Sequence, residues 1–197
     1  MKTYLPDLLD NPFRDFKIDP IDNEAVKALA KSIEEDGFWG GVVIRKNEDG
    51  DYEIICGHHR IRAAIKAGIE YADLYVAKVD DIQTIRMYAR ENATQRGNSS
   101  TALAGSVAAA VKLVATQVYS DGAGNPAPYI ADNKSNTTRE DNAITQGVGW
   151  TQVLEYYRDV PGMNKNVVMQ QLSILKASGD YTRILKAVQK KVDADNK

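Results

Sequence analysis

One short stretch limits what this chain can fold into: Cys56-Gly57-His58-His59-Arg60-Ile61-Arg62-Ala63-Ala64. A β-rich run from Tyr52 to Ile55 precedes it. A helical run from Ile61 to Ala67 follows, and Gly68 stands where a helix-terminating glycine is expected. The sequence therefore predicts that a strand ends, that the chain turns on Gly57 and that a helix begins.

The start of this helix favours an anion. The first backbone N–H groups of a helix lack partners within the helix, and the helix dipole places partial positive charge there. Two arginines and the only two histidines of the chain crowd the same turn. Two interpretations follow: a phosphate-binding turn, or a solvated helix start whose arginines pair with surface carboxylates.

The size and composition of the chain set outer limits. A length of 197 residues fits one large domain or two small ones, since a domain usually has roughly 100–200 residues. The single cysteine, Cys56, excludes an internal disulfide framework, and we expect it to be a small buried residue. Because we find no apolar run long enough for a bilayer and no signal-peptide pattern, we expect a cytoplasmic protein with no membrane partner.

Charge is distributed unevenly along the chain. The net charge is −2, which by itself argues against nucleic acid as a partner. Residues 150–197, however, hold 8 Lys and Arg against 5 Asp and Glu, a balance of +3, whereas residues 1–96 hold 14 against 18, a balance of −4. A DNA contact is therefore expected near the C-terminal end of the sequence, although a mildly basic helix face is also common in solvent.

The N-terminal half predicts a turn-rich segment followed by a helix. Residues 1–21 contain Asn-Pro and Asp-Pro steps, which favour turns or extended backbone. Asp22 or Asn23 caps a helix that runs to about Asp36, where Gly37 ends it. Apolar residues recur along this helix at helical spacing.

A β-hairpin is predicted next. Val42–Arg45 and Tyr52–Ile55 have strand composition, and the residues Asn47 to Gly50 between them are typical of a tight turn. A further strand is expected over Leu74–Ala77. Trp39, beside Gly40 and Gly41, has two interpretations: a core aromatic with flexible neighbours, or a flat side chain next to exposed backbone that suits a planar base.

A second polar cluster lies further along the chain. Asp80 or Asp81 caps a predicted amphipathic helix that ends near Arg90-Glu91-Asn92-Ala93-Thr94-Gln95-Arg96. The cluster is either a frayed, charged helix end or a second face of an anion and metal site. In the second case a carboxylate and an amide hold Mg²⁺ while arginines hold phosphate.

The C-terminal half predicts helices. Residues 101–119 form an alanine-rich helix for close packing, either within the chain or against a partner chain. Residues 120–149 predict a long loop or insertion. Helices over 150–157, 164–176 and 181–192, with a Gly-containing break before the second, outline either a helix-turn-helix or a generic helical hairpin.

The start of the second C-terminal helix would meet DNA in the helix-turn-helix interpretation. Asn164, Lys165 and Asn166 begin that helix, and Gln170 lies about one turn further along. Asparagine and glutamine can read adenine edges, and lysine can read guanine or hold phosphate. These four residues are the predicted DNA contacts.

The order of these motifs resembles that of the ParB family of chromosome and plasmid partition proteins. Asn11-Pro12-Phe13-Arg14 is similar to the first box of the family, and Gly57-His58-His59-Arg60-Ile61-Arg62-Ala63-Ala64 to the arginine-rich second box. Glu91-Asn92-Ala93-Thr94-Gln95-Arg96 is similar to the third box. The resemblance implies an α+β fold: a ParB/sulfiredoxin-like domain over residues 1–97, then an all-α helix-turn-helix domain over residues 98–197.

The resemblance also implies a function and a site. Family members bind CTP with Mg²⁺, hydrolyse it slowly, load on a specific DNA site and close as a dimeric clamp. The implied nucleotide-binding residues are Gly37, Trp39, Gly40, Gly57, His58, His59, Arg60, Arg62, Gln95 and Arg96. Glu91 and Asn92 would bind the metal and organise hydrolysis. The alanine-rich helix over residues 101–119 would transmit the nucleotide state to the dimer.

Several features depart from the family pattern. His58-His59 stands where the family has Glu-Arg, the third box has one extra residue, and residues 120–149 have no counterpart. These departures indicate a divergent plasmid- or phage-type relative. Two alternatives are a ParB-like nuclease or phosphohydrolase, in which His58 or His59 acts as a base or metal ligand, and a transcriptional regulator without nucleotide hydrolysis. Sulfiredoxin chemistry is disfavoured because His58 replaces the reactive cysteine at the turn.

Overall fold

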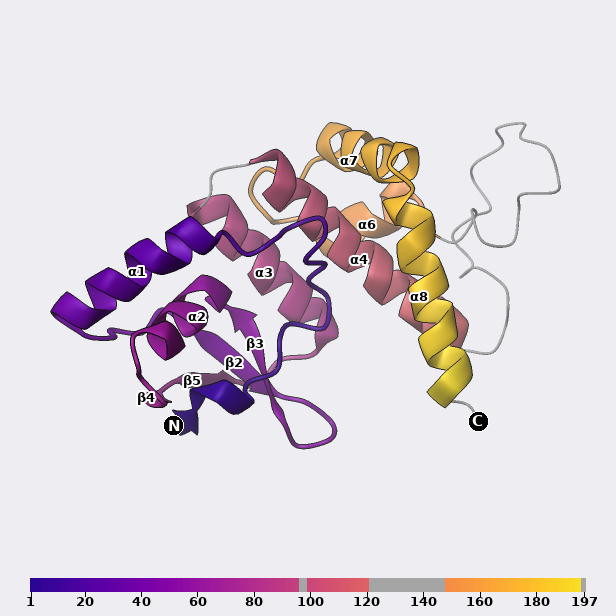
Figure 1. Cartoon of the computed structure of the whole chain (residues 1–197). Helices are drawn as coiled ribbons and strands as arrows, with labels where there is room; N and C mark the ends of the chain where they lie inside the picture. Colours follow the sequence, from indigo (N-terminus) through magenta and orange to yellow (C-terminus); the bar gives the residue numbers. More distant parts are fainter. Residues whose placement is uncertain (96–98, 121–147, 196–197) are drawn as a thin grey trace, which may run out of the picture. The chain divides into compact units, whose positions relative to one another are not determined.

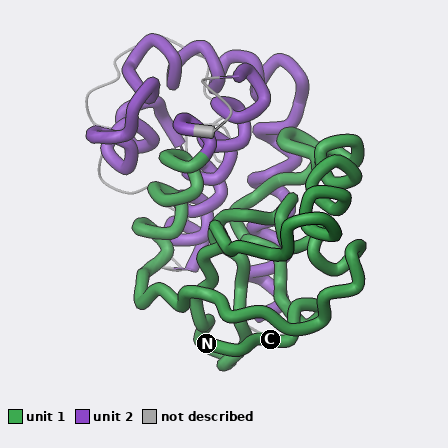
Figure 2. Tube along the Cα trace, turned by 90° about the vertical axis from the view of Figure 1, so that its left-hand side faces the viewer, with its two compact units in different colours: residues 1–91 green, residues 92–197 purple. Residues whose placement is uncertain are grey.

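The computed structural model describes residues 1–95, 99–120 and 148–195. The chain divides into two compact units, residues 1–91 and residues 92–197 (Figure 2). Unit 1 contains both helices and strands, whereas the described residues of unit 2 contain helices and no strand. The predicted α+β class with an all-α second part is confirmed. The division falls after residue 91, inside a helix, whereas the sequence predicted it after residue 97.

A three-stranded sheet forms the centre of unit 1 (Figure 1). Strand β2 (Val43–Lys46) lies in the middle, antiparallel to β3 (Tyr52–Cys56) and parallel to β5 (Tyr75–Ala77). The predicted hairpin is confirmed, and each predicted strand is correct to within one residue at either end. A second small sheet pairs β1 (Lys2–Tyr4) with β4 (Tyr71–Asp73), which the sequence analysis missed.

The helices of unit 1 begin where the sequence supplies a cap or a turn. Asp22 accepts hydrogen bonds from the N–H groups of Glu24 and Ala25 and so caps α1 (Asn23–Asp36), as predicted. Helix α2 (His58–Lys66) begins three residues before the predicted Ile61, directly after Gly57. Both helices pack on one core, which includes Ile33, Ile44, Ile54, Ile61 and Leu74.

The segment before α1, residues 5–22, follows the edge of β3, and we call it the N-terminal strap (Figure 1). It opens with a short 3-10 helix, η1 (Leu5–Asp7). Leu9 donates its N–H to Tyr52 O at 2.9 Å and accepts from Ile54 N–H at 2.9 Å. The strap therefore covers an edge of the sheet that would otherwise present unpaired backbone groups.

A buried ion pair fixes the far end of the strap. Arg14 Nη2 lies 3.1 Å from Asp19 Oδ2, and the two side chains are 4% and 0% exposed. Tyr88 donates its hydroxyl to the same carboxylate oxygen at 2.7 Å. Tyr88 belongs to α3 (Asp81–Gln95), so the pair joins the strap to that helix. A charge buried in this way depends strongly on its partners.

Unit 2 is built around α4 (Ser100–Ser120), which packs against α6 (Trp150–Tyr156), α7 (Lys165–Ala177) and α8 (Asp180–Asp195). The alanines of α4 are buried, as are Val107, Val111 and Leu113. Tyr157 donates its hydroxyl to Ser106 O at 2.6 Å, which ties the end of α6 to α4. In this structure the small side chains fill contacts within the chain, the simpler of the two predicted uses.

Helix α4 corrects one expectation. By length and composition it is apolar enough to cross a membrane, whereas the sequence analysis found no such run. However, 72% of its most apolar window is buried inside the structure, as in the core helix of a helical domain. The predicted loop over residues 120–149 falls almost entirely outside the described residues.

The strap anchor generates a stability prediction. Tyr88→Phe removes a hydrogen bond to a buried charged group, and such bonds are worth about 1.5–3 kcal/mol. We expect the free energy of unfolding, measured by urea denaturation, to fall by about this amount. Tyr71→Phe is the matched control, because the Tyr71 side chain is 54% exposed; it should change stability by less than about 0.5 kcal/mol. Equal effects of the two substitutions would contradict the anchoring role.

Candidate functional site

Gly57 makes the turn between β3 and α2, and no other residue fits there. Its φ of 95° lies in the left-handed region. A Cβ atom built on it would lie 2.8 Å from Val42 Cγ2, 3.0 Å from Gly41 O and 3.1 Å from Val42 Cα. The backbone at residues 41–42 therefore passes directly against the turn, and a side chain on Gly57 would push the two segments apart.

The N-terminus of α2 has features of an anion site. Gly57 is its cap residue and supplies no side-chain acceptor for the first N–H groups. The first turn holds His58, His59 and Arg60 and no acidic residue. The helix dipole adds partial positive charge at this end. The predicted strand–glycine–helix turn is thus present, with its basic residues gathered at the helix start.

Arg60 connects this turn to the loop before β2. Its Nη1 donates to Gly41 O at 2.6 Å. A Cβ atom on Gly41, whose φ is 74°, would lie 3.1 Å from the Arg60 guanidinium. Side chain and loop are therefore in contact, and the structure brings the predicted phosphate and base residues together.

The loop itself, residues 37–41, is open. Gly37 and Gly40 both have positive φ, and a Cβ atom on either would meet nothing within 4 Å. Trp39 is 77% exposed. The core interpretation of Trp39 is therefore wrong, and its indole offers a flat apolar surface beside bare backbone.

The ring of His58 is directed into unit 1. It is 2% exposed, and its Nε2 accepts the backbone N–H of Asn11 at 3.2 Å. Burial above all, and then the charges of Arg14, Arg62 and His59, lower the pKa of His58 to about 3. The sequence analysis predicted that this side chain binds nucleotide, whereas in this structure the ring is enclosed within unit 1 and accepts an internal N–H.

His59 makes the equivalent bond one residue later. Its Nε2 accepts the backbone N–H of Asp22 at 3.0 Å, and its side chain is half-buried. A nitrogen that accepts a hydrogen bond carries no proton, so each neutral ring has its proton on Nδ1. The nitrogen that a base or a metal ligand needs is thus engaged in both histidines, against the nuclease interpretation.

Arg62 pairs with the strap. Its Nη2 lies 3.1 and 3.2 Å from the two carboxylate oxygens of Asp10, and its guanidinium lies 5.8 Å from the centre of the Phe16 ring. Arg14 approaches the same ring at 5.1 Å. For Arg62 the alternative of pairing with a surface carboxylate is therefore realised in this structure, although the side chain remains 45% exposed.

The carboxylate of Glu91, from the third motif, lies near the same residue as the Arg60 guanidinium, namely Cys56. The pKa of the Cys56 thiol is raised to about 12. Burial is the largest cause, the negative charge of Glu91 adds to it, and the positive charge of Arg60 partly opposes it. Both charges therefore lie near the last residue of β3, beside the Gly57 turn. A buried thiol with this pKa remains protonated at neutral pH, which excludes Cys56 as a nucleophile.

Asn92 follows on the same helix and carries an unusual feature. Its side chain is 4% exposed, and among the residues that the structure describes its Nδ2 has no hydrogen-bond partner. A buried donor without an acceptor is costly, and such groups often await a ligand or water. Gln95 ends α3, and Arg96 lies outside the described residues. Among the described residues no three His, Cys, Asp or Glu side chains form a ready metal cluster.

The predicted DNA contacts share the exposed side of α7. Asn164 caps this helix by accepting the N–H of Val167 at 3.1 Å, as predicted. Lys165 lies 4.8 Å above the ring of Trp150. Asn166 and Gln170 are exposed. All four predicted residues are thus accessible on one element of unit 2.

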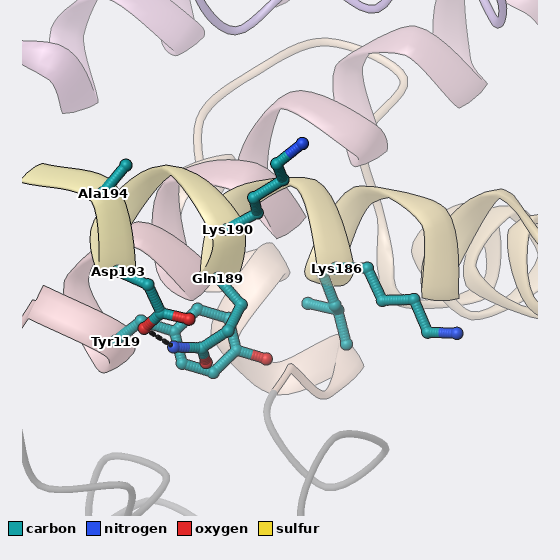
Figure 3. Close-up of a pocket in the computed structure, with 7 residues that line it drawn as sticks. Tyr119, Lys186, Gln189, Lys190, Asp193 and Ala194 are labelled. Atoms are coloured by element: carbon teal, nitrogen blue, oxygen red, sulfur yellow. Dashed lines mark hydrogen bonds between the residues drawn. The ribbon is translucent and has the colours of Figure 1, made fainter.

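A separate hollow lies between the ends of α4 and α8 in unit 2 (Figure 3). Its volume is about 510 Å³, and Tyr119, Lys186, Gln189, Lys190 and Asp193 contribute to its lining. Gln189 donates to Asp193, one turn further along α8, at 2.8 Å (Figure 3). None of the predicted site residues belongs to it.

The sequence analysis missed the supporting roles of two strap residues, Asn11 and Asp10. Asn11 donates its Nδ2 to Ile55 O at 3.1 Å and accepts the N–H of Phe13 at 2.9 Å, so it is enclosed between the strap and β3. Asp10 pairs with Arg62. Membership of Asn11 in the first motif was the available signal, but the motif alone gave it no role.

Comparison with known proteins agrees with this geometry. Residues 4–93 match the family model of the ParB N-terminal domain. A relative in Vibrio cholerae, named "Probable chromosome-partitioning protein ParB", is 39% identical over 69 residues, which are 35% of this chain and 24% of that protein. A nucleoid occlusion protein of Bacillus thuringiensis is 35% identical over 71 residues, 36% of this chain and 24% of that protein. The matches thus span about a quarter of the relatives' length.

Two solved structures, both of a C-terminally truncated chromosome-partitioning protein ParB from Caulobacter crescentus, are more distant. The one complexed to the centromeric parS site has a TM-score of 0.44 and 15% identity, over 89% of this chain and 71% of that one. The one complexed with CTP-γ-S has a TM-score of 0.43 and 20% identity, over 98% and 97%. Scores below 0.5 say nothing of function. The family match and the sequence relatives support ParB family membership for residues 4–93, the part of the chain that is similar to the ParB N-terminal domain.

Proposed function

We propose that the chain is a DNA-binding protein of the ParB partition type, and that it binds a nucleoside triphosphate, CTP, with Mg²⁺ at the start of α2. One observation carries the nucleotide half of the proposal. The Gly57 turn, the Arg60 guanidinium, the open 37–41 loop and the Glu91 carboxylate all meet around Cys56.

The phosphates would lie at the N-terminus of α2. Gly57 provides no side-chain cap for the first N–H groups of α2, which would therefore donate to the phosphate oxygens. Arg60 would exchange Gly41 O for a phosphate oxygen, because a guanidinium prefers an anionic acceptor to a neutral carbonyl. Arg62, half-exposed and paired with Asp10, would add charge at the rim.

The base would rest on the 37–41 loop. Gly37 and Gly40 leave the backbone bare, so its N–H and C=O groups are free of steric cover. The exposed indole of Trp39 has the area and flatness to cover one face of a pyrimidine. Hydrogen bonds from backbone groups would then distinguish cytosine from other bases.

Glu91 and Asn92 fit a magnesium ion that arrives with the nucleotide. Mg²⁺ is usually held by one or two oxygen ligands of the protein together with substrate phosphates, so a preformed cluster of three is unnecessary. When bound, it supplies positive charge to the phosphates. The carboxylate of Glu91 and the amide oxygen of Asn92 would be its ligands. The unpaired Nδ2 of Asn92 would then donate to a phosphate or a water, which also suits slow hydrolysis.

DNA would be bound by unit 2. The second helix of the predicted helix-turn-helix is α7, whose exposed side carries Asn164, Lys165, Asn166 and Gln170. The relatives are named for chromosome partitioning and nucleoid occlusion, which agrees with a role on DNA. We further propose that the protein works in the cytoplasm as a homodimer that nucleotide binding favours. This requires the nucleotide to bind the closed dimer better than the open one.

The nucleotide proposal is tested by removing one charge. Arg60→Ala should weaken binding of CTP and Mg²⁺, measured by calorimetry, by about 1.5–3 kcal/mol, since it removes a charge-assisted hydrogen bond. Lys66→Ala, at the opposite end of the same helix, should leave the affinity unchanged. Titrations with ATP, GTP and UTP establish the base preference. No binding of any triphosphate by the intact chain would reject the proposal.

The DNA proposal is tested on a duplex selected from a random library by the intact chain. Gln170→Ala should cost about 1–3 kcal/mol on the selected site and little on unrelated DNA, as expected of a base contact. Lys165→Ala should weaken binding to the selected site and to unrelated DNA alike. It should also reduce the slope of log affinity against log salt concentration by about one, the effect of one lost phosphate contact. Lys191→Ala, exposed on α8, is the control. Failure to select any site, or unchanged binding in both variants, would overturn the assignment of α7.

A further inference from the structure

The two histidines of the second motif make the same unusual contact twice. Nε2 of His58 accepts the N–H of Asn11 at 3.2 Å, and Nε2 of His59 accepts the N–H of Asp22 at 3.0 Å. Asn11 lies near the middle of the N-terminal strap, and Asp22 is its last residue and the cap of α1. Two adjacent residues at the start of α2 therefore hold the strap at two points.

We propose that His58 and His59 form a clasp of two uncharged imidazoles, which positions the first turn of α2 for its ligand by fastening it to the N-terminal strap. The clasp is a property of the fold, and only its effect on the ligand rests on the proposed function. The two histidines are then positioning residues, while Arg60 and the backbone N–H groups of the turn make the contacts with phosphate.

The chemistry of the clasp requires neutral rings. A backbone N–H can bond only to a ring nitrogen that carries a lone pair, and a protonated imidazole has none. Arginine or lysine at these positions could not accept such a bond at all. The two bonds therefore explain why uncharged side chains stand in a turn that is otherwise suited to cations.

The surroundings of His58 keep it neutral. The ring is 2% exposed and lies edge-on to Phe16, with 6.1 Å between the ring centres. The charged groups that face it are Arg14, Arg62 and His59, and Asp10, whose Oδ1 is 3.9 Å from Nε2. The two permanent cations, Arg14 and Arg62, outweigh one carboxylate, and that carboxylate is already shared with Arg62. The pKa of about 3 is consistent with this geometry.

The clasp also separates two kinds of positive charge. Arg14 is buried in its pair with Asp19, Arg62 pairs with Asp10 while it remains 45% exposed, and a histidine that accepts a backbone N–H adds no charge of its own. Arg60 brings its own charge to the same turn and donates to the Gly41 carbonyl. The first turn of α2 thus keeps a defined position without using up its charge.

The chain contains only two histidines, so imidazole NMR gives an unambiguous test of the clasp without any ligand. Long-range ¹H–¹⁵N spectra of the intact protein at pH 7 should show two neutral rings protonated on Nδ1. On acidification the His58 signal should remain neutral well below pH 6.5, towards its pKa of about 3. Protons on Nε2, or a His58 titration near pH 6.5, would overturn the clasp.

Acid unfolding gives a second readout. Unfolded His58 takes up a proton near pH 6.5 and the folded residue does so near pH 3, so the unfolded state binds more protons between these values. The stabilisation is complete above pH 6.5 and is lost as the pH falls towards 3. As the pH falls, the unfolding equilibrium constant of the wild type should therefore rise more steeply than that of His58→Gln. The difference should reach up to about tenfold per pH unit. Parallel pH profiles for the two proteins would contradict a buried neutral His58.

The effect of the clasp on ligand binding is tested with replacements that differ only in side-chain length. Glutamine places an amide oxygen near the position of Nε2, whereas asparagine is too short. His58→Asn and His59→Asn should each weaken CTP binding about 3- to 10-fold, the range of a typical net hydrogen bond, and the glutamine variants should restore it to within about twofold. Equal loss in both pairs rejects the positioning role. If the wild type binds no triphosphate, the proposed function fails, while the NMR and acid-unfolding results still decide the clasp.

Discussion

The contact between Gly57 and the backbone of residues 41–42 determines most of what surrounds it. Because a Cβ atom on Gly57 would lie 3.0 Å from Gly41 O, the end of β3 and the loop before β2 can approach only through a glycine. That approach places Gly41 O within reach of Arg60 and leaves the 37–41 loop beside the first turn of α2. Loop, turn and arginine are thus arranged by one steric condition.

The electrostatics of the site follow from what the strap neutralises. Two carboxylates of the strap form ion pairs, Asp10 with Arg62 and Asp19 with Arg14. Two backbone N–H groups of the strap donate hydrogen bonds to His58 and His59. A buried ion pair is weak support for stability by itself, but it is costly to break, so the strap is held firmly once formed. The charges of Arg60 and Glu91 both lie near Cys56, at the end of β3.

Local signals in the sequence predicted the elements well where they were strong. The Asp22 cap, Gly37, and the Asn47–Gly50 turn sit at the predicted places, because capping and turn chemistry depend on a few neighbouring residues. Strands β1 and β4 were missed, since three-residue strands have no readable period. Helix α2 began earlier than predicted because His58 and His59 are held in place by Asn11 and Asp22, 47 and 37 residues away in sequence.

The same limit applies to the site. The residue types at the turn correctly marked where Gly57 and Arg60 would gather with the loop, and the motif order placed Glu91 near them. The role of His58 was not predictable, because whether an imidazole faces a ligand or accepts an internal N–H depends on the strap that covers it. Trp39 was equally ambiguous until its 77% exposure was known.

Backbone amide shifts measured during titration with CTP and Mg²⁺ test the central claim most directly, since they locate the ligand on the intact chain. We predict that the largest changes fall on the amides of residues 37–41, 57–62 and 91–95. Changes confined to the hollow between α4 and α8, around Tyr119 and Lys190, would contradict the assignment of the nucleotide to the start of α2.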